Sequence, residues 1–140
     1  MLRRRWCGAR LVLVTVAGRS MEPTYRSGDR VLAVRCPGQR VRRGQVVVVT
    51  APAPAGGWPA DAPPATLSRG DWLIKRAVAV AGDPVPRSVA PMVGPGIRAV
   101  PAGALVVIGD GPRSGDSRQW GFVPVHQVLG VVLLTVRRPG

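Results

Sequence analysis

The stretch DWLIKRAVAV (residues 71–80) joins an apolar run, typical of a buried strand, to the only lysine of the chain. The protein has 20 basic residues, and all the others are arginines. Arginine keeps its charge in proteins, whereas a lysine that is removed from water can lose its proton. A neutral amine can act as a general base or as a nucleophile, so Lys75 is a candidate catalytic residue. Two alternatives are a chance outcome of the composition and a lysine at a strand edge whose amine reaches water.

Short Val-rich runs recur along the chain and predict an all-β fold. The expected strands are 11–17, 30–35, 45–50, 72–80, 104–108 and 128–136, separated by turns that contain Gly or Pro. No segment shows the sustained periodicity of a helix. Two Pro- and Gly-rich stretches, 51–70 and 84–101, are expected to be irregular loops. We therefore predict a basic tail over residues 1–10 and one compact, mostly antiparallel domain over residues 11–138.

The composition limits the core and the partners. Hydrophobic residues make up 46% of the 140 residues but aromatic residues only 4%, so Val, Leu, Ile and Ala must supply most of the core. The net charge of +13 allows attraction to an anionic membrane surface. Nucleic-acid binding is not expected, because stacking aromatics are few and no helix-turn-helix or zinc-finger spacing is present.

The N-terminal half of the chain gives no sign of a membrane span or a metal site. The apolar run 11–17 is far shorter than the roughly 20 residues that cross a bilayer. Cys7 and Cys36 form neither a CxxC pair nor a metal-binding set, and either one disulfide or two free thiols would fit. Neither a metal nor a cofactor is called for.

A candidate nucleophile follows the first expected strand, in the stretch GRSMEPTYRSGD (residues 18–29). Pro23 has a fixed φ and favours an extended conformation for the residue before it, so the turn can hold the hydroxyl and the N–H of Ser20 in one direction. A serine nucleophile needs a base. The only histidine, His126, has no triad-like surroundings, and Lys75 is the better candidate, since Ser-Lys pairs are a known variant of the Ser-His-Asp arrangement.

Four stretches in this order resemble the type I signal peptidase family, the Ser-Lys endopeptidases that remove signal peptides. They are SMEPT (20–24), GDRVLAV with RRGQVVVV (28–49), IKRAVAVAGD (74–83) and VPAGALVVIGDGPRSGDSRQWGFVPVHQVLGVV (100–132). The resemblance covers about residues 14–136. It implies a half-barrel of the signal-peptidase type, with the family's second β domain reduced to a loop between the last two stretches.

The resemblance also implies roles for individual residues. Ser20 would be the nucleophile, with its N–H as an oxyanion donor, and Lys75 would be the general base. Ser114 would hydrogen-bond the lysine amine, and Asp116 with Arg118 would form an ion pair that supports the site. The alternatives are ordinary turn residues for Ser114 and Ser117, and a surface ion pair of little energetic value for Asp116 and Arg118.

Two further residues would lie at the substrate pocket by the same resemblance, Gly18 and Met21. Gly18 stands where some members carry a second oxyanion hydroxyl, and core filling is the alternative for Met21. Gly111 replaces the Asn that is usual in the family, a change expected to affect a turn more than the chemistry.

The resemblance implies a serine endopeptidase that removes signal or leader peptides through an acyl-enzyme. Its partner would be an extended peptide segment of a precursor protein, bound along a strand edge. Peripheral association with a membrane is expected, with a cytoplasmic location as the alternative because no span is visible. Three other interpretations stay open: a maturation protease for one partner, such as a nickel-type superoxide dismutase precursor; a self-cleaving repressor relative, for whose DNA-binding domain the chain has no room; and a catalytically silent basic β-domain.

Overall fold

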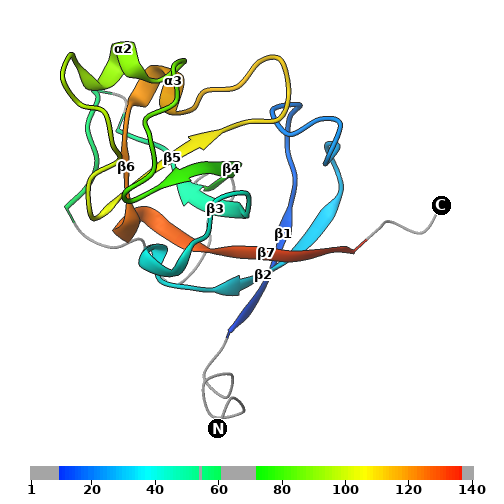
Figure 1. Cartoon of the computed structure of the whole chain (residues 1–140). Helices are drawn as coiled ribbons and strands as arrows, with labels where there is room; N and C mark the ends of the chain where they lie inside the picture. The colour runs from blue at the N-terminus through cyan, green and yellow to red at the C-terminus, as the bar shows by residue number, and fades with distance from the viewer. Residues whose placement is uncertain (1–9, 54, 61–71, 137–140) are drawn as a thin grey trace, which may run out of the picture.

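Seven strands form one antiparallel sheet in the computed structural model, which describes residues 10–53, 55–60 and 72–136 (Figure 1). The strands are β1 (Leu11–Thr15), β2 (Arg30–Arg35), β3 (Val46–Thr50), β4 (Trp72–Val80), β5 (Ala104–Ile108), β6 (Val123–Pro124) and β7 (Val128–Val136). Their order across the sheet is β1-β2-β7-β3-β4-β5-β6. The sheet curls into a half-barrel, so the predicted all-β, mostly antiparallel fold is confirmed.

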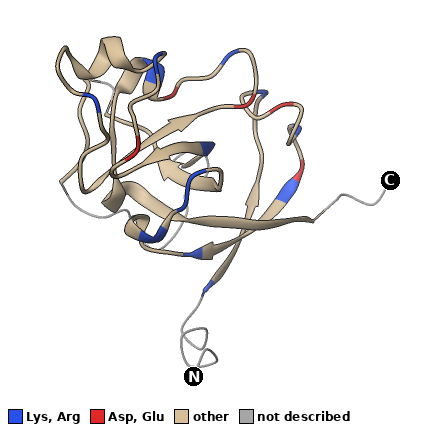
Figure 2. Ribbon diagram, in the orientation of Figure 1, with Lys and Arg blue, Asp and Glu red and all other residues tan. Residues whose placement is uncertain are grey.

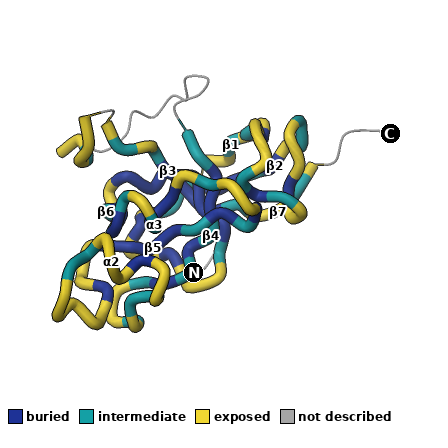
Figure 3. Tube along the Cα trace, turned by 90° about the horizontal axis from the view of Figure 1, so that it is seen from above, coloured by how far each residue is buried: buried dark blue, intermediate teal, exposed yellow. Residues whose placement is uncertain are grey.

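Three irregularities in strand pairing accompany the curl. The register shifts between Leu32 and Ala33 on β2, between Val48 and Val49 on β3, and between Ala77 and Ala79 on β4. Such bulges bend a strand and increase its twist. They lie on strands that also carry buried valines and alanines, so bending brings the apolar faces together around one interior (Figure 3).

The described helices are single turns in the connections between strands. They are η1 (Gly38–Arg40), α2 (Ala90–Val93), α3 (Ser117–Trp120) and η2 (Val125–Gln127). The stretch 84–101, expected to be an irregular loop, contains the single turn α2 and an antiparallel bridge between Pro84 and Ala99. The two-residue strand β6 was not predicted, since a pair of residues carries no readable alternation.

The expected strand boundaries were close to those observed. The first strand ends at Thr15 rather than at residue 17, because the chain turns toward β2 and the Val16 N–H bonds to the Asp29 carbonyl oxygen. Gly18 then adopts a φ of 81°, a conformation that glycine accepts without strain. Of the expected loop 51–70, residues 54 and 61–70 lie outside the described part of the chain.

Valine dominates the interior, as the composition predicted. The largest buried cluster combines β3, β4, β5 and β7, and its members are Val41, Val47, Val49, Ala77, Leu105, Val107, Val123, Val125, Val128 and Val131. A second cluster joins β1 and β2 to the same strands and includes Val16, Met21, Tyr25 and Ile74. Strand β4 contributes to both clusters, so a side chain on its inner face has little access to water.

The charged residues are spread over the described chain rather than gathered on one element (Figure 2). None of the described helices is long and apolar enough to span a bilayer. Within the same residues, no three His, Cys, Asp or Glu side chains come together in a way that could hold a metal ion.

Candidate active site

Lys75 lies on β4 opposite Val47 of β3 and is only 2% exposed. Its Nζ donates a hydrogen bond to Ser114 Oγ at 2.8 Å. Burial lowers the pKa of this amine, an effect that Asp116 opposes and Arg118 reinforces. The alternative of a strand-edge lysine with its amine in water is therefore wrong, because β4 lies inside the sheet between β3 and β5.

Ser20 sits in the turn that follows β1, and this turn packs on the loop after β5. The Ser20 carbonyl oxygen accepts a hydrogen bond from the Gly111 N–H at 2.7 Å. A Cβ at Gly109 would lie 2.3 Å from Ser114 Oγ and 2.5 Å from the Ser20 carbonyl oxygen. The two serines therefore press against one glycine from two directions, and only a residue without a side chain fits between them.

The Ser20 backbone also has a free donor. No hydrogen bond from the Ser20 N–H is present within the described residues, whereas the N–H groups of Glu22 and Tyr25 in the same turn bond to the carbonyl oxygens of Arg19 and Met21. In the same part of the chain, no direct hydrogen bond joins the Ser20 hydroxyl to the Lys75 amine. Ser114, which bonds to Lys75 and contacts Gly109, is the group that links the two predicted catalytic residues.

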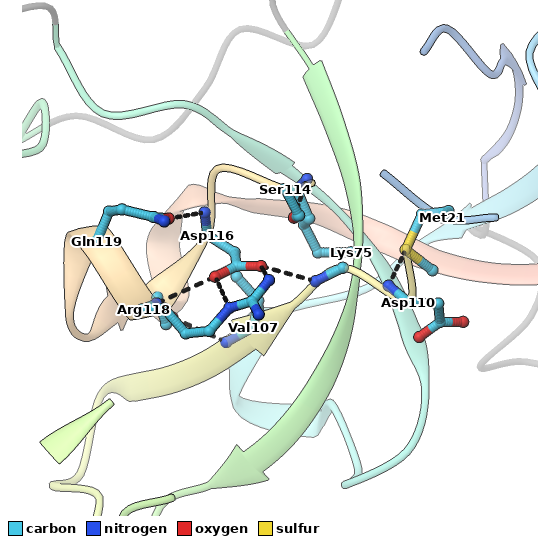
Figure 4. Close-up of polar contacts among 10 residues, drawn as sticks. Met21, Lys75, Val107, Asp110, Ser114, Asp116, Arg118 and Gln119 are labelled. Carbon is cyan, nitrogen blue, oxygen red and sulfur yellow. Dashed lines mark hydrogen bonds and ion pairs between the residues drawn. The ribbon is translucent and has the colours of Figure 1, made fainter. Parts of the chain in front are cut away.

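Buried Asp116 and partly exposed Arg118 form an ion pair in the loop segment that follows Ser114 (Figure 4). The Asp116 side chain is 0% exposed, and the Arg118 guanidinium contacts both of its oxygens, at 3.0 Å from Nε and 2.9 Å from Nη2. Burial by itself would raise the pKa of Asp116, but hydrogen bonds from Arg118, the Gly109 N–H and Ser114 outweigh it and lower that pKa to about 2. The interpretation as a surface ion pair is wrong, because one partner has no access to water.

The local sequence explains why this loop has a fixed shape. Asp116 is the N-cap of α3, and with Gln119 it forms a capping box in which each side chain bonds the other residue's backbone N–H. Ser117 is buried, and its Oγ accepts a hydrogen bond from the Val107 N–H of β5 at 2.9 Å. Ser117 is therefore a tie between α3 and the sheet rather than an ordinary turn residue.

The two predicted pocket residues differ in their surroundings. Met21 is 1% exposed, and its Sδ accepts a hydrogen bond from the Asp110 N–H at 3.4 Å. Gly18 is exposed and has open space where a side chain would be. The Nε2 of His126 donates a hydrogen bond to the carbonyl oxygen of Pro59, in the connection between β3 and β4.

A second ion pair, which the sequence analysis did not single out, braces the other side of the Ser20 turn. Arg76, the residue after Lys75, donates to both oxygens of Asp110, at 2.9 Å from Nε and 2.7 Å from Nη2. The Thr24 hydroxyl donates to the same carboxylate at 2.6 Å. These contacts lower the pKa of Asp110, with the Arg76 hydrogen bond as the main cause. The sequence contains both partners, Arg76 in IKR and Asp110 in GDG, but only the fold shows that these two residues form an ion pair.

Gly111 has a more direct role than the sequence suggested. A Cβ at this position would lie 2.3 Å from the Arg19 carbonyl oxygen, and the Gly111 N–H is the group that bonds Ser20. The sequence analysis expected Gly111 to affect a turn more than the chemistry, and the turn that it contacts is the one that carries the candidate nucleophile. Cys36 is a free thiol that donates to the Pro37 carbonyl oxygen, whereas Cys7 lies outside the described residues.

Comparison with known proteins identifies the family of the chain. The chain has no match among curated proteins. Residues 7–92 and 87–136 match the family described as signal peptidase, peptidase S26. Because the two matches together cover nearly the whole chain, the protein belongs to the signal peptidase family of peptidases.

Proposed function

We propose that the protein is a serine endopeptidase in which Ser20 and Lys75 cut signal or leader peptides from precursor proteins. Membership of the signal peptidase family gives the reaction class, peptide-bond hydrolysis. The observation that carries the finer proposal is the buried Lys75 amine, whose hydrogen-bond partner Ser114 contacts the same glycine as the Ser20 turn. A lysine in this position is suited to general-base work because burial favours its neutral form.

The reaction would take place in two halves. Neutral Lys75 takes the proton from the Ser20 hydroxyl as Oγ bonds to the scissile carbonyl carbon, and the oxyanion binds the free Ser20 N–H. The carbon–nitrogen bond then breaks, and the Lys75 ammonium returns its proton to the leaving amine. In the second half, Lys75 takes a proton from water as the water attacks the acyl-enzyme, and Ser20 leaves with that proton.

Ser114 and Asp116 support this chemistry without touching the substrate. Ser114 gives the amine an oxygen partner on one side, so that Nζ has a defined direction before substrate arrives. Asp116 receives hydrogen bonds from Arg118 and the Gly109 N–H, which fixes the loop that carries Ser114. Catalytic hydrogen bonds in free enzymes often shorten only when substrate binds, so a Ser20–Lys75 contact is expected to form in the complex.

The direct test is cleavage of purified precursor proteins, with mass spectrometry to locate the cut. Wild-type protein should release one leader fragment, whereas Ser20→Ala and Lys75→Arg should each be folded and inactive. Arginine keeps the positive charge but cannot give up its proton, so it separates base chemistry from charge. Cleavage by either variant at the wild-type rate would refute the proposed pair. A panel that includes secretory precursors and single dedicated leaders would show whether the enzyme is general or serves one partner.

We further propose that the domain contacts an anionic membrane at its periphery. Large apolar side chains are exposed on β1 and on the end of β7, namely Leu11, Leu13, Leu133, Leu134 and Val136. Leu13 of β1 and Leu134 of β7 are both register partners of Leu32 on β2, so they share one face of the sheet. Together with the net charge of +13, this apolar face suits a surface of anionic lipids.

The membrane contact can be measured by co-sedimentation with phosphatidylglycerol vesicles. Leu13→Glu should weaken binding, because it places a negative charge in the middle of the apolar face. Met92→Glu is the matched control, since Met92 has the same exposure of 50% but lies on α2, at the far side of the molecule from β1 (Figure 1). Equal loss of binding in both variants would show that net charge alone determines the attraction.

A further inference from the structure

A loop between β3 and β4 is fastened to the segment that carries the site. Residues 55–60 are largely exposed, but Trp58 is half-buried and packs against the largest core cluster. The next residue, Pro59, accepts two hydrogen bonds through its carbonyl oxygen, from His126 and Gln127, both at 3.0 Å. The loop is therefore held at Trp58 by packing of the indole and at Pro59 by hydrogen bonds from the side chains of His126 and Gln127.

Trp58 meets Trp120, the last residue of α3. Their ring centroids are 5.9 Å apart and the planes are inclined by 82°, an edge-to-face arrangement that aromatic rings favour. Both rings pack against the same cluster of valines. Trp120 is thus covered by a residue that lies more than 60 positions away in the sequence.

Trp120 in turn touches the loop that holds the Lys75 partner. A Cβ at Gly115 would lie 3.5 Å from Trp120 Cζ2, so the indole lies against the residue between Ser114 and Asp116. The backbone N–H of Trp120 also donates a hydrogen bond to the Asp116 carbonyl oxygen at 3.0 Å. A continuous path of contacts therefore leads from Trp58 through Trp120 and the Gly115 backbone to Ser114, whose hydroxyl bonds the Lys75 amine.

We propose that Trp58 is a positioning residue of the Ser20–Lys75 centre, because it holds Trp120, and through Trp120 the Ser114–Asp116 loop, against the Lys75 amine. The inference rests on the proposed function for its catalytic meaning. Exposed loops are mobile unless contacts hold them, and the Gly115 backbone has no side chain of its own to fix it. The indole of Trp120 lies at van der Waals distance from that backbone, and Trp58 keeps the indole there.

Loosening this contact should admit water to the amine and raise its pKa, because burial is the main cause that lowers it. The charged groups that act on the amine are Asp116 and Arg118, while Val47 faces it from β3. Neither charged group belongs to the 55–60 loop, and among the described residues His126 is an ionisable residue with a hydrogen bond to this loop. A change in Trp58 therefore acts through packing and leaves every charge in place.

The single lysine makes the test direct. Protein labelled with ¹³C-lysine should give one ε-carbon resonance from lysine, whose pH titration reports Lys75 without any need for substrate. Trp58→Ala should move the midpoint upward toward the ordinary value of 10.5, and Trp58→Phe should stay near wild type because it keeps a ring edge on Trp120. Leu32→Ala is the control, since it removes a half-buried side chain from β2 at the other end of the sheet.

Cleavage kinetics give the second measurement. Trp58→Ala should lower kcat about two- to tenfold, the rate equivalent of the interaction energy of one aromatic pair. KM should stay almost unchanged, and the acid limb of the pH profile of kcat should shift to higher pH.

An unchanged Lys75 midpoint and an unchanged kcat in folded Trp58→Ala would overturn the inference even if the wild type is an active peptidase. A wild type that cleaves nothing but whose Lys75 midpoint responds to Trp58 would refute the peptidase proposal and keep the positioning. If Trp58→Ala does not fold, His126→Ala loosens Pro59 more mildly and should raise the midpoint by less; no shift there would also overturn the inference.

Discussion

Replacing Lys75 by methionine should make the protein more stable while abolishing activity. The residue Lys75 is 2% exposed, and among the described residues its amine has one hydrogen-bond partner, the neutral Ser114. The protonated form of this amine is therefore poorly solvated in the fold. Exchanging a buried ionic group for an apolar one of similar volume is neutral or stabilising by about 1–4 kcal/mol, and the lost hydrogen bond costs about 1 kcal/mol. We therefore expect Lys75→Met to raise the free energy of unfolding by about 1–2 kcal/mol at pH 7.

The pH dependence of this gain gives the reasoning a second check. The folded pKa of Lys75 is lowered, so the unfolded chain binds more protons at every pH between the folded value and 10.5. Wild-type stability must then rise with pH across that interval, and the advantage of Lys75→Met should shrink toward pH 10. Urea unfolding of both proteins at pH 7 and pH 10 measures this directly.

The companion variant is Lys75→Arg, which keeps a charge that cannot be lost. It should be less stable than wild type by about 2 kcal/mol or more, because the buried position then keeps its charge at all accessible pH values and its acidic neighbour, Asp116, is already paired with Arg118. Opposite signs for the two variants are the signature of a buried amine held near neutrality. A Lys75→Met protein that is less stable than wild type at pH 7, or a difference that does not change with pH, would refute the argument.

Three further predictions concern the residues around the amine. Asp116→Asn should lower the free energy of unfolding by about 2 kcal/mol at pH 7. This difference from wild type should fade as the pH falls from 3.8 through about 2, because the lowered pKa stabilises the fold only while the carboxylate is ionised. Urea midpoints measured between pH 2 and pH 7 would test it. Gly111→Ala should reduce stability by about 1–3 kcal/mol and lower kcat, because its Cβ would overlap the Arg19 carbonyl oxygen behind Ser20, and an active, equally stable variant would contradict this. Asp110→Asn should lower kcat about tenfold on a soluble peptide with a smaller change in KM, because it weakens the Arg76 and Thr24 contacts that brace the Ser20 turn.

Much of the fold could be predicted because the local signals agree with it. Valine-rich runs bounded by Gly-containing turns marked strands such as β4 and β5 closely, since each strand is long enough to show its pattern. The curvature could not be predicted, because it depends on register shifts such as that between Ala77 and Ala79, which have no signal in composition. The single turn α3 was also not predicted, because four residues are too few to show helical periodicity, although Asp116 and Gln119 have the spacing of a capping box.

The candidate site divides in a similar way. Ser20 and Lys75 stand out as residues because each is unusual in its surroundings, a serine at a fixed turn and a lysine in an apolar strand. The pairing of Arg76 with Asp110 does not stand out, since arginines are common in this chain and the partners lie 34 positions apart. The Trp58–Trp120 contact is still harder to foresee, because Trp58 lies in a Pro- and Ala-rich loop that predicts only irregular structure.

The charge arrangement explains how an acidic neighbour can sit near Lys75 without keeping the amine protonated. A free carboxylate next to a buried lysine would raise the lysine pKa and remove the base from the reaction. Asp116 has some of this effect, but its charge is shared among the Arg118 guanidinium and the N–H groups of Gly109 and Arg118. Arg118 also acts on Lys75 directly and lowers the amine pKa. The ion pair thus fixes the Ser114 loop while contributing little net charge to the amine, so burial remains the effect that sets the protonation state of Lys75.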